Sequence, residues 1–142
     1  MNPIVSIIMG STSDLPVMEK AARFLDDMHI PFEMNALSAH RTPAEVEAFA
    51  AGTTLPVIGV PIKGMLDGLD AMLSIIQMPP GIPVATVGVN GALNAAILAA
   101  EMLALSDAAL AERVEAYKAG LKEKIVKANS ELAEVKYAYK TN

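Results

Sequence analysis

The stretch IVSIIMGSTSD, residues 4–14, decides the fold class of this chain. Its first part, residues 4–9, is an almost uninterrupted apolar run rich in β-branched side chains, which is typical of a strand buried on both faces. A polar turn follows at once, and apolar side chains then recur at helical spacing from Val17 to Met28. We therefore expect a buried strand, a tight turn, and a helix that Ser13 or Asp14 caps.

The same alternation of strand and helix continues along the chain. Further strands are expected over residues 31–37, 55–60 and 84–89, and helices from 43, over 65–76, over 92–105 and from 106 to about 128. Such alternation indicates βαβ units, a parallel sheet and right-handed crossovers. The predicted fold class is α/β: a three-layer sandwich with a parallel β-sheet, flavodoxin-like, plus a long C-terminal helix. We expect residues 1–142 to form one domain, with the C-terminal helix and arm at about 106–142.

The composition narrows the class of protein. Of the 142 residues, 53% are apolar but only 4% are aromatic, and a domain of this size has little interior in which to bury so many small apolar side chains. We therefore expect a homo-oligomer, the alternative being alanine-rich helices that simply expose their alanines. The absence of cysteine excludes a disulfide scaffold, a thiolate zinc site and a cysteine nucleophile.

Charge and hydropathy exclude two kinds of partner. The formal net charge of −5 argues against a protein that binds nucleic acid through a broad basic face. The most apolar stretch, residues 84–105, is interrupted by Asn90, Asn94 and Glu101, which disfavours a membrane span. The N-terminus has no basic leader, so we expect a cytoplasmic protein.

Ligands of open parallel sheets bind outside the carboxyl ends of the strands, so the first strand-end loop is a candidate site. Residues 10–14 offer backbone amides and hydroxyls at a helix start, which suit a phosphate, and the carboxylate of Asp14, which suits ribose hydroxyls. A capped helix start without any ligand has a similar sequence.

The second strand-end loop, residues 38–42, contains His40 and Arg41. Arginine is a forked donor for phosphate or carboxylate, and histidine exchanges a proton near neutral pH. The other histidine, His29, falls at the end of the first helix, where a structural or solvated role is expected. Two histidines are too few for a metal site of the usual kind, so no metal is predicted.

Five stretches together resemble a known family. They are MGSTSD (9–14), SAHRTP (38–43), LPVIGVPI (55–62), GLDAMLSIIQMPPGIPVATV (68–87) and NGALNAAILAAEML (90–103). In this order they resemble the 5-(carboxyamino)imidazole ribonucleotide mutases of purine (IMP) biosynthesis, the bacterial mutase class of PurE, over residues 4–105. The resemblance implies a cofactor-free isomerase that converts 5-(carboxyamino)imidazole ribonucleotide to 4-carboxy-5-aminoimidazole ribonucleotide by decarboxylation and recarboxylation.

The resemblance also implies roles for individual residues. His40 matches the family histidine that shuttles the proton, as general acid to the departing amine and general base at the ring carbon. The matching substrate-binding residues are Ser11 and Arg41 on the phosphate side, Asp14 at the ribose, and Ser13 and Ser38 in lesser contacts. The family forms homo-octamers in which neighbouring subunits complete each site.

Two other functions remain open. The related aminoimidazole ribonucleotide carboxylase uses carbon dioxide and tends to have lysine at the position of Arg41. The other is a non-catalytic flavodoxin-like module that binds a nucleotide or flavin. Flavin sites usually stack the ring on aromatic side chains, but all three tyrosines, Tyr117, Tyr137 and Tyr139, lie in the C-terminal region, away from every strand-end loop.

One departure from the family lies between Ala51 and Thr53. Here the family carries a further strand, a glycine-rich loop with a second active-site histidine, and the start of a helix. Either the protein lacks this segment, which would open the middle of the parallel sheet, or it contains the segment in addition to these 142 residues. An intact mass of 14.9 kDa would exclude the second explanation.

Overall fold

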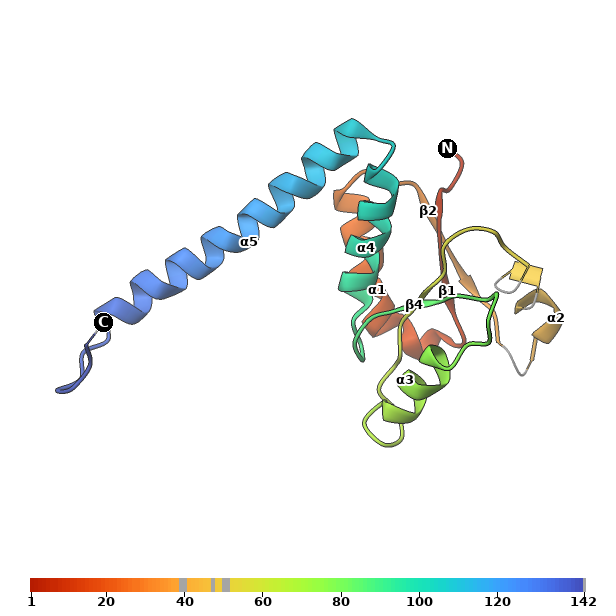
Figure 1. Cartoon of the computed structure of the whole chain (residues 1–142), viewed down its shortest axis with the longest axis horizontal. Helices are drawn as coiled ribbons and strands as arrows, with labels where there is room; N and C mark the ends of the chain where they lie inside the picture. Colours follow the sequence, from red (N-terminus) through yellow and green to blue (C-terminus); the bar gives the residue numbers. More distant parts are fainter. Residues whose placement is uncertain (39–40, 47, 50–51, 142) are drawn as a thin grey trace. The chain divides into compact units, whose positions relative to one another are not determined.

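The structure is a computed structural model that describes residues 1–38, 41–46, 48–49 and 52–141. It divides into two compact units, Met1–Met102 and Leu103–Asn142, and each is treated by itself below. Figure 1 shows the helices and strands along the chain.

The first unit begins with the predicted strand, turn and helix. Strand β1 (Val5–Met9) pairs in parallel with β2 (Phe32–Ala36), and the register runs from Val5 opposite Phe32 to Met9 opposite Ala36. Between them lie a short 3-10 turn, η1 (Thr12–Asp14), and the helix α1 (Leu15–Asp27) (Figure 1). One face of α1 is buried through Ala21, Ala22, Phe24 and Leu25. The apolar side chains that recur at helical spacing in the sequence thus lie on the buried side of this helix.

The second half of this unit has shorter strands than the sequence predicts. Strand β3 (Ile58–Gly59) pairs in parallel with β4 (Ala85–Thr86), with helix α3 (Leu69–Ile76) between them in sequence. Helix α4 (Ala92–Ala104) follows β4, as predicted. A Cβ atom at Gly59 would clash with Ile75 Cγ2 of α3, so glycine permits this close approach of helix to strand.

The described strands form two separate two-stranded sheets, β1–β2 and β3–β4. The α/β class and the parallel pairing are confirmed, but no described strand joins the pairs into one sheet. The division falls in sequence between β2 and β3, where the departure at residues 51–53 lies. Each sheet therefore has edges whose backbone groups make no ladder hydrogen bonds with a described strand.

Helix α3 does not bury its apolar side. Its stripe of leucine and isoleucine is exposed in the single chain, as are the methionines beside it: Leu66, Leu69, Leu73, Ile76, Met65 and Met78. Met65 is 79% exposed and Met78 is 40% exposed. Periodicity identifies the apolar face of a helix without saying whether its own chain covers that face.

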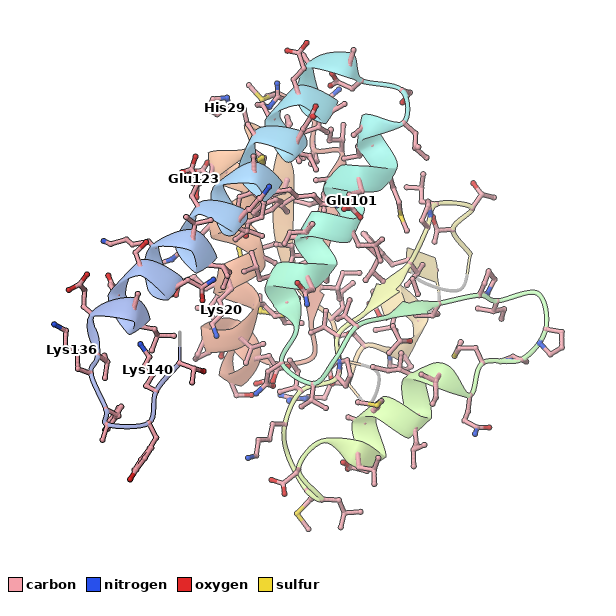
Figure 2. The ribbon with its side chains drawn as sticks, turned by 60° about the vertical axis from the view of Figure 1, so that its left-hand side comes forward. Lys20, His29, Glu101, Glu123, Lys136 and Lys140 are labelled. Atoms are coloured by element: carbon pink, nitrogen blue, oxygen red, sulfur yellow. The ribbon has the colours of Figure 1, made fainter. Side chains whose placement is uncertain are left out.

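The second unit is dominated by α5 (Ala108–Glu134). Its first turn is capped by Asp107, whose Oδ1 accepts a 2.9 Å hydrogen bond from the Leu110 amide. The helix also extends past residue 128 into the predicted arm. At its far end the Lys140 ammonium donates to the Leu132 carbonyl at 2.5 Å, which satisfies one terminal acceptor (Figure 2). Among the described residues, no helix is both long and apolar enough to cross a membrane.

A strained segment precedes α3. Leu66, Asp67 and Gly68 all have positive φ, at 49°, 56° and 89°, and a leucine in this left-handed region costs about 1–2 kcal/mol. Leu66 is 74% exposed, so little packing offsets the strain.

We expect Leu66→Asn to raise the free energy of unfolding by about 0.5–1 kcal/mol, because asparagine tolerates the left-handed region. The control is Leu55→Asn, since Leu55 is 71% exposed and has no positive φ. Urea unfolding followed by circular dichroism measures both. Equal changes in the two variants would contradict the strain at residue 66.

Candidate functional site

The loops that follow β1 and β2 share one edge of their sheet. Parallel strands place their carboxyl ends together, so residues 10–14 lie at the same sheet edge as Ser38, Arg41 and Thr42. The Leu37 amide donates to the Met9 carbonyl at 2.9 Å, which ties the two loops at their base. The structure therefore brings the two predicted substrate-binding segments to the same place.

The first loop is organised by Ser11. The Ser11 hydroxyl accepts a 3.3 Å hydrogen bond from the Ser13 amide, and the Ser11 carbonyl accepts one of 3.1 Å from the Asp14 amide. Ser11 is thus the cap of the turn η1. Asp14 occupies the N-cap position of α1, as the sequence predicts, but its side chain makes no capping hydrogen bond. Among the described residues, the Asp14 carboxylate accepts one long contact of 3.4 Å, from the Ser13 hydroxyl. It stays available to accept from a ligand.

The second loop is a tight turn around the backbone of Ser38. The Ser38 carbonyl accepts from the amides of Arg41 (3.1 Å) and Thr42 (2.7 Å), and its amide donates to the Thr42 hydroxyl at 3.0 Å. Helix α2 (Pro43–Val46) starts directly after Thr42. The turn leaves Arg41 exposed, and no ion pair is found for it within the described part of the chain. A free guanidinium at this edge can bind an anion.

His40, the predicted catalytic residue, lies outside the described residues. Its neighbours Ser38 and Arg41 are described and belong to the turn above. The role of His40 therefore remains a prediction from the sequence.

The loops after β3 and β4 are joined by Asn90, which the sequence analysis did not select as a site residue. Its side-chain Oδ1 accepts from the Lys63 amide at 2.9 Å, and its own amide donates to the Pro61 carbonyl at 2.8 Å. Asn90 has a positive φ of 58°, which asparagine adopts more readily than most residues. The signal in the sequence is the Asn90-Gly91 dipeptide, a strong turn marker.

The described site residues thus fall into two bonded groups. Ser11, Ser13 and Asp14 form one, and Ser38 with Arg41 forms the other. No hydrogen bond joins side chains of the two groups in the part of the chain that is described. This edge therefore offers donors that suit a phosphate, namely hydroxyls, loop amides and a guanidinium. It also offers a carboxylate that can accept from ribose hydroxyls.

His29, the histidine that the structure describes, does not lie at this edge. Figure 2 shows His29 beyond the end of α1, at the opposite end of that helix from residues 10–14. It is exposed, with a positive φ of 54°, as expected for a solvated helix end. A shallow hollow of about 280 Å³ lies beside it, lined in part by Asp26 and Phe32 at the amino ends of the strands. This hollow is on the wrong side of the sheet for the predicted chemistry. No group of three or more metal-ligating side chains occurs among the described residues.

A family model and several relatives match this chain. The model of AIR carboxylase matches residues 4–52 and 46–124. The chain is 46% identical to the N5-carboxyaminoimidazole ribonucleotide mutase of Pyrococcus abyssi over 147 residues, covering 84% of each chain. It is 43% identical to the mutase of the same name from Thermotoga maritima, covering 95% of each. The phosphoribosylaminoimidazole carboxylase of Saccharomyces cerevisiae is 41% identical over 170 residues, which span all of this chain and 30% of that enzyme.

A solved structure agrees with this result. The crystal structure of Treponema denticola PurE superposes with a TM-score of 0.72 at 28% identity, covering 92% of this chain and 99% of that one. The overall α/β arrangement is therefore that of a known PurE.

The comparisons also locate the departure between Ala51 and Thr53. The yeast alignment runs over 170 residues although this chain has only 142, so that relative holds residues with no counterpart here. The family match breaks into two segments at residues 46–52, between α2 and β3, where the sheet divides. Apart from this internal segment, the match extends through most of both units. The chain belongs to the AIR carboxylase family.

Proposed function

We propose that this protein is a 5-(carboxyamino)imidazole ribonucleotide mutase. The observation that carries the proposal is the pairing of β1 with β2, which sets the hydroxyl and carboxylate loop beside the arginine loop at one sheet edge. The relatives with the name mutase support it, because they match along most of their own length. The substrate is a small phosphorylated ribonucleotide.

In this function the two loops divide the substrate between them. Ser11 and Arg41 bind the phosphate, Asp14 accepts from the ribose hydroxyls, and Ser13 and Ser38 make lesser contacts. The exposed guanidinium of Arg41 and the uncommitted carboxylate of Asp14 support these roles.

His40 carries the proton. The bond from the exocyclic nitrogen to the carboxylate carbon breaks and releases carbon dioxide, and His40 supplies the proton that the nitrogen gains. Carbon dioxide then forms a bond to the ring carbon, which loses its proton to His40. Atoms and charge balance without a cofactor, so the net reaction is an isomerisation.

We further propose that the protein works as a cytoplasmic homo-octamer built from a single α/β domain, with its C-terminal helix and arm at about 106–142. The exposed apolar stripe of α3 supports an oligomer, because leucine and isoleucine side chains on a free surface favour burial against another subunit. Light scattering on the purified protein measures the number of subunits.

The activity is tested with purified protein and both carboxylated ribonucleotides. A mutase interconverts the two compounds without bicarbonate or a nucleoside triphosphate. The yeast carboxylase motivates the one alternative: turnover of the uncarboxylated aminoimidazole ribonucleotide with bicarbonate, but not of the carboxyamino compound, would identify the protein as a carboxylase instead. A yellow protein carrying flavin would contradict both.

Asp14→Asn will weaken ribonucleotide binding by about tenfold, since a charged acceptor to a hydroxyl contributes about 1.5–3 kcal/mol and the amide retains part of it. Isothermal titration with the substrate measures the change. The matched control is Asp26→Asn, because Asp26 lies at the other end of α1 beside the remote hollow. A similar loss in both variants would remove Asp14 from the site.

A further inference from the structure

Strand β1 has one paired and one unpaired edge. The Val5 amide donates to the Pro31 carbonyl at 3.3 Å, and the Met9 carbonyl accepts from the Leu37 amide at 2.9 Å. The backbone groups of Val5, Ile7 and Met9 therefore face β2. Because these groups alternate along a strand, those of Ser6 and Ile8 face the opposite edge. No described strand pairs with β1 at that edge.

Strand β3 has an unpaired edge of the same kind. The carbonyls of Val57 and Gly59 accept from the amides of Ala85 and Val87 at 3.0 and 3.2 Å, so residues 57 and 59 face β4. The backbone groups of Ile58 and Val60 are directed to the other edge, where none of the described strands pairs. The side chains of Ile8, Ile58 and Val60 are all half-buried. Three of the four residues whose backbone faces these edges are thus apolar and half-buried, and the fourth, Ser6, is exposed.

Two such edges inside one compact unit are unusual, because parallel strands are normally paired on both sides and covered. One added parallel strand would satisfy both edges and give the order β2, β1, new strand, β3, β4, which is the doubly wound arrangement. The family match breaks between α2 and β3, and relatives hold additional residues there. The unfilled position in the sheet and the unmatched residues in the relatives therefore coincide.

We propose that this chain binds a separate polypeptide as the missing strand, by strand addition between β1 and β3. The partner is an extended segment whose apolar side chains suit the half-buried Ile8, Ile58 and Val60. Its backbone pairs with Ser6, Ile8, Ile58 and Val60. A second copy of this chain is the less suitable partner. A two-fold axis pairs identical edges antiparallel, whereas the position between β1 and β3 takes a parallel strand.

The probe is a synthetic peptide with the sequence of the Pyrococcus abyssi mutase that has no counterpart in this chain. We expect saturable one-to-one binding in titration calorimetry, which a scrambled peptide does not reproduce. Hydrogen exchange of the amides of Ser6, Ile8, Ile58 and Val60 should slow by about tenfold or more with the peptide bound. The amides of Val5 and Gly59, which already face a partner strand, should change far less and serve as the internal control.

Two changes that remove backbone hydrogen bonds, one in the protein and one in the peptide, test the strand pairing directly. Ile8→Pro removes only an amide that faces away from β2, so the β1–β2 ladder is kept while the added strand loses a donor. Binding should fall by about tenfold relative to Ile8→Val. If the proline variant does not fold, a peptide N-methylated on alternate residues tests the same bonds on the unaltered protein.

Three results would overturn the proposal. They are binding no tighter than that of the scrambled peptide, unchanged exchange at the four amides with peptide bound, and protection of these amides in a dimer of the chain alone. None of these readouts requires turnover, so they are independent of the proposed mutase activity.

Discussion

His40→Asn abolishes interconversion of the two carboxylated ribonucleotides while ribonucleotide binding survives. Asparagine keeps hydrogen-bonding groups at position 40 but cannot exchange a proton near neutral pH, so both proton transfers lose their carrier. We expect turnover to fall by about 100-fold or more, which is the usual contribution of general acid–base catalysis. The assay follows the carboxylated ribonucleotides, and calorimetry measures binding in the same samples.

The matched control is His29→Asn. It makes the same change at a histidine that is exposed beyond the end of α1, where asparagine also suits the positive φ. Turnover should therefore remain at the level of the unaltered protein. Full turnover in the His40 variant, or an equal loss in both variants, would refute the role given to His40.

Leu25→Ala lowers the free energy of unfolding by about 2–5 kcal/mol, because truncation of a buried leucine removes apolar contacts and leaves a cavity. Leu25 is 1% exposed on the buried face of α1. Since α1 sits between β1 and β2 in the chain, the loss should destabilise the pair that positions the site. Urea unfolding monitored by circular dichroism gives the value.

Leu55→Ala serves as the comparison, since Leu55 is 71% exposed. A surface substitution of this kind should stay within about 0.5 kcal/mol. A loss at Leu25 below about 1 kcal/mol would mean that α1 is not packed as the structure has it.

The N-terminal part of the fold could be predicted because its pattern is local. An almost uninterrupted apolar run rich in β-branched residues, a Gly-Ser-rich turn and a period of 3.6 over residues 17–28 each favour one structure, and β1, η1 and α1 follow them closely. The Ala-rich helix over 92–105 is equally clear and appears as α4.

The short strands and the exposed α3 face could not be predicted in the same way. The run at 55–60 has the apolar character of a buried strand, yet only Ile58 and Gly59 pair, because strand length depends on neighbouring strands and no described strand pairs with the other edge of β3. The exposure of Leu69 and Leu73 depends on what covers α3, which no property of the helix itself determines.

The site was predictable in its position but not in its bonding. The rule that ligands bind at carboxyl ends of parallel strands selects the loops of Ser11 and Arg41, and the β1–β2 pairing brings these loops together. That Ser11 caps a separate 3-10 turn before the N-cap position of α1 at Asp14 depends on one backbone conformation that several residues of the loop could equally support. Asn90 was missed because its side-chain partner, Lys63, lies 27 residues away in the chain.

Because Asn90 makes two hydrogen bonds to residues 61–63, we expect the loops after β3 and β4 to move together. To move away from the sheet edge, residues 61–63 must first release both the amide and the side chain of Asn90. A molecule that immobilises either loop therefore lowers the entropy cost of immobilising the other. Ordering at this edge should accordingly occur in one step, with a common relaxation rate for Lys63 and Asn90.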